Sequence, residues 1–309
     1  MTDVSVVIVS YESRELLARC LAALAADAGR IATVETIVVD QASQDGTAAW
    51  LAAEHPDVHL VALPENVGFG AGNNRGAAVA NGRWLLLLNS DAFVRPGAID
   101  ELVRFAETHP ATGAVGPRLL WPDGRLQRSC RRFPTVFRLA TEYLYLRKLA
   151  PRSRALNGFY CGEFAHDAPR QVDWVTGACV LVRRELFERL GGFDETFFLY
   201  SEEVDLLYRA SRLGAETWYD PAAEVVHVWG GTAERASALT LEEQARSHVR
   251  YLDKHVSRAE AGRARSVLLA GLRLRAPRSA AYREAARWLA ARPVEKLLAG
   301  TRPERRGSG

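Results

Sequence analysis

A run of four consecutive leucines constrains the fold of this chain more than any other stretch. It lies within residues 84–92, WLLLLNSDA, and polar residues follow it directly. The run is too short for a free-standing helix, and an unbroken apolar run of this length is typical of a strand buried on both faces. In open α/β sheets, ligands bind at the carboxyl ends of such strands. That end carries Asn89, Ser90 and Asp91 here.

Asp91 has two interpretations at this position. A carboxylate at a strand end can hold a divalent cation against a diphosphate. Alternatively, Asp91 caps the turn before a helix that begins near Pro96, and the local sequence alone favours this structural role. The other motifs of the chain have to decide between the two.

Strands and helices alternate before the leucine run. The predicted strands are residues 4–9, 34–39 and 58–63, and the predicted helices are residues 16–24, 48–53 and 71–81. This alternation predicts a mostly parallel sheet with right-handed crossovers and helices on both faces. Ser10, Tyr11 and Glu12 follow the first strand, and Asp40 follows the second. We therefore expect these polar residues at the same sheet edge as Asp91.

A glycine-rich segment, NVGFGAGNNRG, occupies residues 66–76. Glycine lets the backbone approach a ligand, and free amide groups at a helix start favour an anion such as a phosphate. The alternative is a merely flexible loop. The segment lacks both the GxGxxG spacing and a Walker lysine, so by itself it is a weak signal.

The second half of the chain continues with mixed elements. The predicted strands are residues 114–121, 174–182 and 224–228, and the predicted helices are residues 135–149, 183–190, 202–213, 239–255, 260–274 and 280–298. For the aromatic helix at residues 135–149, core packing is favoured over contact with a lipid-linked acceptor. Residues 150–173 are interpreted as a mobile loop that could close over a bound donor.

Charged residues cluster at two places in this half. Four arginines follow a turn at residues 122–124, and a solvated face is favoured for them over contact with a phosphate; they are Arg125, Arg128, Arg131 and Arg132. Glu202, Glu203 and Asp205 crowd the first turn of a helix. Capping explains acids at a helix start, but it does not require three of them.

Composition bounds the class of protein. With 309 residues, of which 48% are hydrophobic, the chain can form one large or two modest domains. No charged-then-apolar leader follows the single Met, and no apolar run reaches bilayer length, so we expect a cytoplasmic protein. Four cysteines without paired spacing argue against a zinc site and against disulfides; they are Cys20, Cys130, Cys161 and Cys179.

Positive charge is concentrated at the end of the chain. Residues 258–309 hold 13 Lys and Arg against four acidic residues. Such a segment can lie on anionic lipid or contact nucleic acid, although solvated helix faces are the commoner explanation, and we expect no nucleic-acid partner. The last helix could be a membrane foot, a packed lid or a homodimer surface, and residues 301–309 are expected to be disordered.

Six motifs in order give a specific resemblance. They are VSVVIVSYES, VVDQASQDGT, ENVGFGAGNNRG, LLLLNSDAFV, VTGACVLVRRELFERLGGFDETFFLYSEEVDLLYR and HVWGGT. Together they resemble the family 2 glycosyltransferases, and in particular their bacterial rhamnosyltransferase-like branch, over residues 4–232. The resemblance implies an α/β GT-A fold around one mixed sheet. It divides the chain into a nucleotide-sugar-binding half (1–113), an acceptor-binding half (114–235), C-terminal helices (236–300) and a tail (301–309).

The resemblance also implies residues that bind the donor. Asp40 resembles the carboxylate that reads the nucleotide base, and Asp91 resembles the last carboxylate of the metal-binding DxD motif, with Asn89 in place of its first Asp. The donor-binding set is Ser10, Tyr11, Glu12, Asp40, Asn66, Gly68, Asn73, Asn89 and Asp91. Mg²⁺ takes most of its other ligands from water and substrate phosphates, so one protein carboxylate does not exclude metal use.

Catalytic and acceptor-binding roles follow in the same way. Glu203 occupies the position of the catalytic base, where family members usually have Asp. The acceptor-binding set is Trp174, Gly177, Glu202, Asp205 and Arg209, with Glu202 and Asp205 either binding acceptor hydroxyls or orienting Arg209. His227 is interpreted either as a second metal ligand beside Asp91 or as a structural histidine.

The implied activity is an inverting, metal-dependent transfer of a sugar from a nucleotide-sugar. The best donor expectation is dTDP-L-rhamnose, ahead of a UDP-sugar, with Mg²⁺ or Mn²⁺ as cofactor and a glycan or lipid-linked saccharide of bacterial surface polysaccharide synthesis as acceptor. Two alternatives remain open: a nucleotidylyltransferase, and a non-catalytic nucleotide-sugar-binding protein with a decayed site. Asn89, Gln41 and Glu203, which depart from the family pattern, motivate the second alternative.

Overall fold

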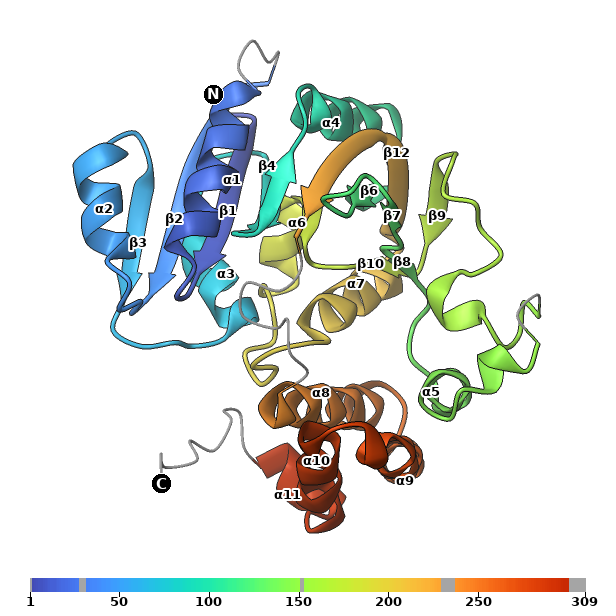
Figure 1. The fold of residues 1–309 in the computed structure, drawn as a ribbon. Helices are drawn as coiled ribbons and strands as arrows, with labels where there is room; N and C mark the ends of the chain where they lie inside the picture. Colours follow the sequence, from blue (N-terminus) through green and yellow to red (C-terminus); the bar gives the residue numbers. More distant parts are fainter. Residues whose placement is uncertain (1, 28–31, 151–152, 229–236, 300–309) are drawn as a thin grey trace.

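One mixed sheet, with ten strands in the described part of the chain, organises the protein (Figure 1). This computed structural model describes residues 2–27, 32–150, 153–228 and 237–299. The main path of the sheet runs β3-β2-β1-β4-β11-β6-β12-β5, with β7 beside β6 and β9 beside β12, and β10 pairs with β8 in a small second sheet. The expected α/β architecture with one mixed sheet is confirmed.

The bounds of the elements show how closely they follow the sequence pattern. The strands are β1 Val4–Ser10, β2 Val34–Gln41, β3 His59–Leu63, β4 Trp84–Asn89, β5 Ala92–Val94, β6 Thr112–Leu120, β7 Leu126–Gln127, β8 Cys130–Arg131, β9 Arg170–Val172, β10 Trp174–Val175, β11 Cys179–Arg183 and β12 Glu216–His227. The helices are α1 Arg14–Ala26, α2 Thr47–Glu54, α3 Phe69–Ala77, α4 Ala98–Thr108, α5 Val136–Tyr143, α6 Arg184–Arg189, α7 Glu202–Arg212, α8 Ala238–His255, α9 Arg258–Arg275, α10 Ala280–Ala290 and α11 Val294–Ala299. The described residues also form the short 3₁₀ turns η1 Leu146–Lys148, η2 Gly158–Tyr160 and η3 Ala276–Arg278.

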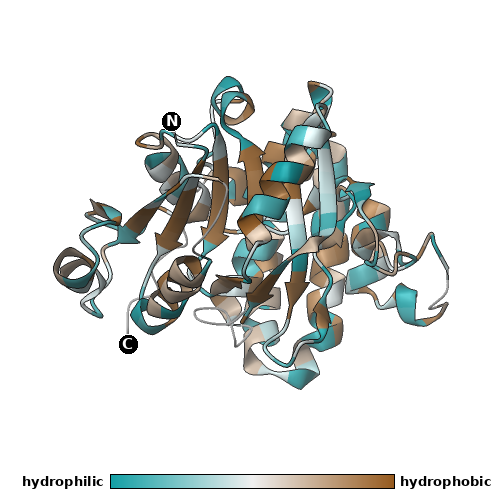
Figure 2. Ribbon diagram, turned by 90° about the horizontal axis from the view of Figure 1, so that it is seen from above, coloured by the Kyte–Doolittle hydropathy of each residue, from teal (hydrophilic) through white to brown (hydrophobic). Residues whose placement is uncertain are grey.

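The leucine run forms β4 at the centre of the sheet. β1 pairs in parallel with both β2 and β4, while β11 pairs antiparallel with β4 and with β6. Because β1, β2 and β4 run in the same direction, their carboxyl ends meet at one edge, as predicted. Several neighbouring strands of the sheet are brown, and therefore hydrophobic, in Figure 2.

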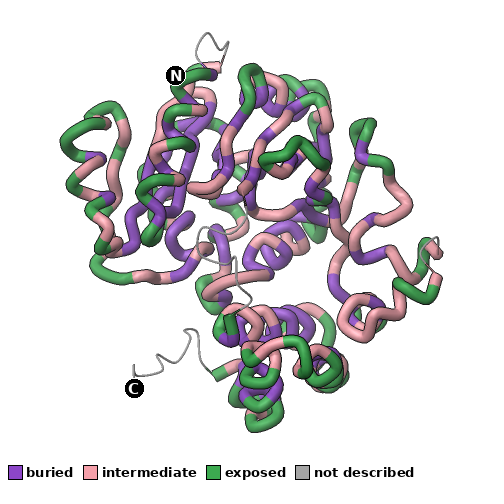
Figure 3. Tube along the Cα trace, viewed as in Figure 1, coloured by how far each residue is buried: buried purple, intermediate pink, exposed green. Residues whose placement is uncertain are grey.

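The two faces of the sheet each pack against an apolar core, which explains why its strands are unbroken hydrophobic runs in the sequence. Val7, Leu85 and Leu87 face a core shared with α7 and the C-terminal helices. Ile8 and Leu86 face a second core shared with α1 and α4. Alternate residues point to opposite faces, and here both faces are covered, so neither set of positions can be polar. Figure 3 shows the sheet as the most buried part of the molecule.

The glycine-rich segment is mostly helix. Most of its glycines lie in α3, which packs directly on the sheet. A Cβ at Gly72 would come within 2.9 Å of Val9 Cγ1, and a Cβ at Gly76 would clash with Val7. These glycines are required for close packing of helix on strand. Gly68 is different, because its φ is +94° and it precedes the helix.

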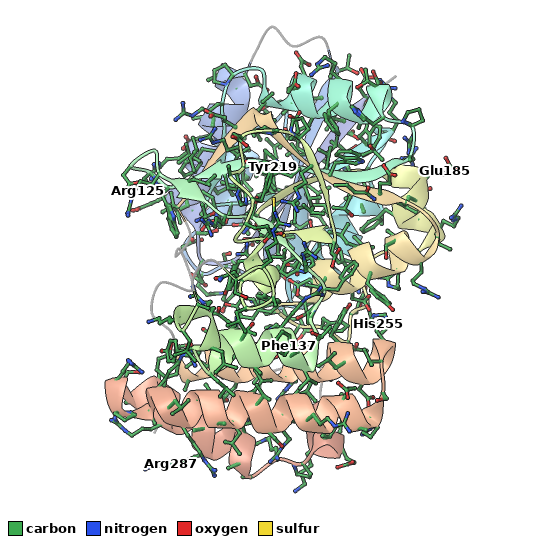
Figure 4. The ribbon with its side chains drawn as sticks, turned by 90° about the vertical axis from the view of Figure 1, so that its right-hand side faces the viewer. Arg125, Phe137, Glu185, Tyr219, His255 and Arg287 are labelled. Atoms are coloured by element: carbon green, nitrogen blue, oxygen red, sulfur yellow. The ribbon has the colours of Figure 1, made fainter. Side chains whose placement is uncertain are left out.

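Four helices, α8 to α11, form a separate layer beside the edge of the sheet (Figures 1 and 4). In Figure 4, His255 lies at the junction between this layer and the body, whereas Arg287 lies on the far side. The predicted helix over residues 280–298 is divided at Pro293 into α10 and α11. No helix among the described residues is long and apolar enough to cross a membrane. The expected disordered tail lies outside the described residues.

Several predicted elements differ from the observed ones. The helix expected over residues 135–149 ends at Tyr143, because Tyr145 adopts a left-handed φ of +59°. The strand expected over residues 174–182 is interrupted between β10 and β11. Within the expected loop 150–173, of which residues 151–152 are not described, η2 and β9 form. Asp91 is not a helix cap, since β5 separates it from α4, whose N-cap is Gly97.

Candidate functional site

A cavity of about 780 Å³ opens at the carboxyl ends of β1, β2 and β4. Asp91 lies on its sheet side, and Glu203, at the start of α7, also lines it. The cavity collects ten of the residues proposed from sequence: Tyr11, Asn66, Gly68, Asn89, Asp91, Trp174, Gly177, Glu202, Glu203 and His227. Two acidic positions more than a hundred residues apart in sequence therefore share one space.

Asp91 and His227 meet at the wall formed by β4 and β12. His227 Nε2 lies 3.3 Å from Asp91 Oδ1, and His227 Nδ1 lies 2.7 Å from Gln127 Oε1. Gln127 is buried on β7 and holds the ring through Nδ1, the nitrogen opposite the one that faces Asp91. With Nδ1–H donating to Gln127 Oε1, the ring is held with Nε2 facing the carboxylate of Asp91.

This pair fits a divalent cation. A lone pair and a carboxylate oxygen that face each other are stable only with a positive charge or a proton between them. A carboxylate and a histidine whose other nitrogen is fixed by an amide are a common arrangement of metal ligands. Among the described residues, no group of three or more His, Cys, Asp or Glu side chains converges as a metal site. The protein would thus supply two ligands, and a bound diphosphate and water would supply the rest.

Two carboxylates lie side by side at the start of α7. Burial raises the pKa of Glu202 well above its usual value, and the charge of Glu203 adds to this effect. Burial also raises the pKa of Glu203, opposed by the backbone N–H of Gly177 and the charge of Arg131. Neither Glu202 Oε2 nor Glu203 Oε2 has a hydrogen-bond partner among the described residues. A raised pKa and a free oxygen suit a group that takes a proton from a substrate.

The other wall is shaped by the turn before α3. Asn66 Oδ1 accepts a hydrogen bond from Gly68 N at 2.9 Å, and Gln41 Oε1 accepts one from Val67 N at 2.9 Å. A Cβ at Gly68 would clash with the carbonyl oxygen of Phe198, which precedes α7. The positive φ of Gly68 and this close approach both require glycine. The turn therefore joins the sheet edge to the segment that carries Glu203.

Four proposed donor-binding residues do not line the cavity. Ser10 bonds Ser13 at 3.0 Å, Glu12 accepts from Gln44 N at 2.8 Å, Asp40 accepts from Ser43 N at 3.3 Å, and Asn73 donates to Phe69 O at 3.0 Å. These bonds shape the turns that support the cavity. Asp40 Oδ1 and Asn73 Oδ1 are buried without a partner in the described part of the chain.

The structure does not bring Asp205 and Arg209 to the cavity. Asp205 is fully buried behind α7, where Arg209 Nε at 2.7 Å, Lys254 Nζ at 2.6 Å and His255 Nε2 at 2.7 Å surround it. These bonds lower the pKa of Asp205 to about 2 against the opposing effect of burial. Arg209 also donates to the carbonyl oxygens of Leu190 and Gly192. Asp205 thus orients Arg209, which was one of the two roles expected for it. Asp205 joins α7 to α8, and Arg209 joins α7 to the turn after α6.

Several residues that line the cavity were missed or misjudged from sequence. Arg131 lines it and lies over the ring of Tyr160, so the favoured solvated face is wrong for this residue, whereas Arg128 lines the cavity and is also exposed. The solvated face holds for Arg125, which is exposed and pairs with Asp123. Arg132 pairs instead with Glu163. Polar residues of α8 form a further wall, and they were missed because no functional role was predicted from sequence for the helix over residues 239–255.

Comparison with known proteins agrees with this geometry. Residues 5–191 match the family described as Glycosyl transferase family 2. An N-acetylglucosaminyl-diphospho-decaprenol L-rhamnosyltransferase of Mycobacterium tuberculosis is 34% identical over 268 residues, which cover 82% of this chain and 86% of that protein. A low-salt glycan biosynthesis hexosyltransferase, Agl10 of Haloferax volcanii, is 27% identical and covers 74% of this chain and 67% of its own length.

Solved structures share the fold. The mannosyltransferase PcManGT from Pyrobaculum calidifontis, in complex with GDP-Man and Mn²⁺, superposes with a TM-score of 0.56 at 20% identity, covering 96% of this chain and 84% of that one. GalNAc-T7 with UDP, GalNAc and Mn²⁺ gives a TM-score of 0.57 at 17% identity, covering 80% of this chain and 47% of that one. The fold is the expected GT-A fold. Since the family match spans more than half of the sequence and the mycobacterial relative aligns along most of both proteins, this chain belongs to glycosyl transferase family 2.

Proposed function

We propose that this enzyme transfers L-rhamnose from dTDP-L-rhamnose to a hydroxyl of a lipid-linked saccharide in surface glycan synthesis. The similarity to the mycobacterial L-rhamnosyltransferase supports this choice of donor and acceptor. The single observation that carries the catalytic proposal is the shared cavity, with Asp91 and His227 on one side and Glu203 on another. A sugar held between them has a leaving group at one end and a base at the other.

Glu203 is the proposed base of an inverting displacement. Its carboxylate takes the proton of the acceptor hydroxyl while the hydroxyl oxygen forms a bond to the anomeric carbon. The bond from that carbon to the diphosphate oxygen breaks on the opposite face, and the bonding electrons leave with dTDP. A carboxylate within about 3 Å of the hydroxyl can perform this transfer. Its unpartnered Oε2 and its raised pKa support the assignment.

Asp91 and His227 are the proposed protein ligands of a divalent cation, Mg²⁺ or Mn²⁺. When bound, such a cation neutralises negative charge on the departing diphosphate. Gln127 keeps the ring of His227 in the orientation that this role needs. Arg131, whose charge acts on Glu203, favours the ionised form of the base.

Nucleotide release is the test of this proposal. We expect the wild-type enzyme with dTDP-L-rhamnose, Mn²⁺ and a polyprenyl-diphospho-N-acetylglucosamine acceptor to release dTDP. Glu203→Gln should lose transfer by a factor of about 100 or more and still bind dTDP-L-rhamnose. Glu185→Gln, an exposed change on α6 at the rim of the molecule in Figure 4, is the matched control and should retain full activity.

Other outcomes of the same assay would overturn the proposal. Pyrophosphate release from dTTP and a sugar phosphate would indicate a nucleotidylyltransferase. Nucleotide binding without turnover over a broad acceptor panel would indicate a non-catalytic binding protein. Full transfer by Glu203→Gln would remove this residue from the chemistry.

We also infer that the enzyme works in the cytoplasm at the inner face of the membrane, where a lipid-linked acceptor is reached. The basic balance of residues 258–309 supports this location. Leu149 and Leu274 expose 80% and 54% of their surface close to basic residues of η1 and α9. Sedimentation with vesicles of anionic phospholipid should carry the protein down at low salt and lose it at high salt, whereas sedimentation independent of lipid charge would contradict the inference.

A further inference from the structure

The face of α8 that lines the cavity is mostly polar, although Leu239 and Leu241 near its start line the cavity too. Thr240, Glu243, Gln244 and His248 all line the cavity, and they follow the i, i+3, i+4, i+8 spacing of a single helix face. A helix that covers a core normally presents apolar side chains there. These four positions also lie beyond residues 5–191, which the family match covers. Their polarity therefore needs an explanation of its own.

Two polar atoms on this face are buried without a partner. Glu243 is 3% exposed and His248 is 8% exposed. Glu243 pairs with Arg246 through one oxygen at 3.4 Å, whereas Glu243 Oε2 and His248 Nδ1 have no hydrogen-bond partner within the described ranges. Buried polar groups are almost always hydrogen-bonded, so two orphans on one wall of a cavity indicate a ligand that completes them.

The chemistry of the face indicates a neutral ligand rich in hydroxyl groups. Burial lowers the pKa of His248 to about 4, so the imidazole is neutral and offers one donor and one acceptor. Burial raises the pKa of Glu243. Glu202, Glu203 and Glu243 line this part of the cavity, whereas the arginines that line it, Arg128, Arg131 and Arg275, lie outside α8. A hydroxyl both donates and accepts, so it suits either group.

Aromatic rings complete a site of the kind that sugars occupy. Tyr143 packs edge-on against His248, with ring centroids 6.0 Å apart, and Tyr282 lines the same cavity. A pyranose has polar edges for hydrogen bonds and an apolar C–H face for such rings. The polar face of α8 and these rings therefore suit a pyranose.

The position of α8 indicates whether this pyranose is the donor sugar or the acceptor sugar. In Figure 1, α7 lies between the sheet and α8, and Asp205 on α7 is bonded to Lys254 and His255 on α8. The face of α8 thus lies beyond Glu203 from the sheet edge. Resting on the proposed transferase function, we propose that this face binds the acceptor pyranose, with Glu243 and His248 as the residues that determine acceptor specificity.

Ligand binding tests the proposal without depending on turnover. Saturation-transfer NMR with methyl pyranosides of glucose, galactose, N-acetylglucosamine and rhamnose, with and without dTDP and Mn²⁺, should identify one that binds the wild-type protein. Glu243→Gln and His248→Ala should each weaken that pyranoside about tenfold, the loss of one buried hydrogen bond, with dTDP affinity changed less than about twofold. Glu284→Gln, exposed on α10, is the matched control and should change neither. Thermal unfolding of each variant verifies that it is folded.

Two results would refute the proposal that α8 binds the acceptor pyranose. One is equal pyranoside affinity in the wild type and both variants. The other is no binding of any pyranoside to a wild-type protein that binds dTDP. If dTDP itself failed to bind, the proposed donor would be refuted, while the titration without nucleotide would still decide the role of α8. In the transfer assay, the variants should raise the acceptor KM and leave the donor KM unchanged.

Discussion

Asp205 gives the clearest test of how the body is joined to the C-terminal helices. Its carboxylate is 0% exposed and is bonded by Arg209 from its own helix and by Lys254 and His255 from α8. Asp205→Asn keeps the size of the side chain and removes its charge. We expect the free energy of unfolding to fall, because two cations lose the anion that neutralises them.

The magnitude follows from the pKa of Asp205. The native bonds lower this pKa from 3.8 to about 2. At about 1.4 kcal/mol per unit, the charge contributes about 2 kcal/mol at neutral pH. Removing one member of a fully buried pair costs about 3–5 kcal/mol, but Lys254 is 33% exposed, so water compensates part of its loss and the smaller figure holds.

The lowered pKa of Asp205 also determines how its contribution to stability changes with pH. Because the folded pKa is depressed, the contribution is fully present above the unfolded value of 3.8 and is lost as the pH falls through about 2. The difference between the wild type and Asp205→Asn should therefore be about 2 kcal/mol at pH 7 and about half of that at pH 3.

Urea unfolding at both pH values measures these differences. Glu188→Gln on α6 is the matched control, since Glu188 also pairs with an arginine one turn away, Arg184 at 3.0 Å, but is 59% exposed. Its loss should change the free energy of unfolding by less than about 0.5 kcal/mol. If Asp205→Asn were as stable as the wild type and raised the acceptor KM instead, Asp205 would bind acceptor and the structural role would be refuted.

Three further predictions concern the site and its support. Gln127→Ala should raise the Mn²⁺ concentration for half-maximal activity about tenfold, because His227 loses the group that orients it; an unchanged Mn²⁺ titration would contradict this. Gly76→Ala should lower the free energy of unfolding by about 2 kcal/mol in urea, because its methyl group clashes with Val7; an equal midpoint would show that α3 can move away. Glu202→Gln should raise the free energy of unfolding by about 1 kcal/mol at pH 7. The pKa of Glu202 is raised in the folded protein, so this carboxyl destabilises the fold as the pH rises above its unfolded pKa. The gain should therefore vanish when unfolding is measured near pH 4.

The sheet and much of the site could be predicted from sequence because local signals determine them. The leucine run favoured a strand covered on both faces, and the polar residues after it were therefore expected at the carboxyl edge. Parallel strands then brought Asn89 and Asp91 to the same cavity as Tyr11. The acidic first turn of α7 marked Glu203 in the same local way.

Long-range contacts account for what sequence could not show. Gln127 fixes His227 from a two-residue strand a hundred positions away, and no local pattern marks it. Asp205 and Glu203 share one helix turn, yet the helix rotation sends Asp205 behind α7 toward Lys254. The end of α5 was also not predicted. The helix ends before Tyr145, which has a positive φ, and no glycine in the sequence marks this position.

The central claim is that Asp91 with His227 and Glu203 act on one donor from different sides of one cavity. Anomalous diffraction from crystals of the protein with dTDP and Mn²⁺ tests it most directly. We predict a manganese peak within about 2.3 Å of Asp91 and His227, beside the diphosphate, with Glu203 facing the space next to the diphosphate end. A manganese ion held elsewhere, or a nucleotide that leaves Glu203 facing a different surface, would contradict the account.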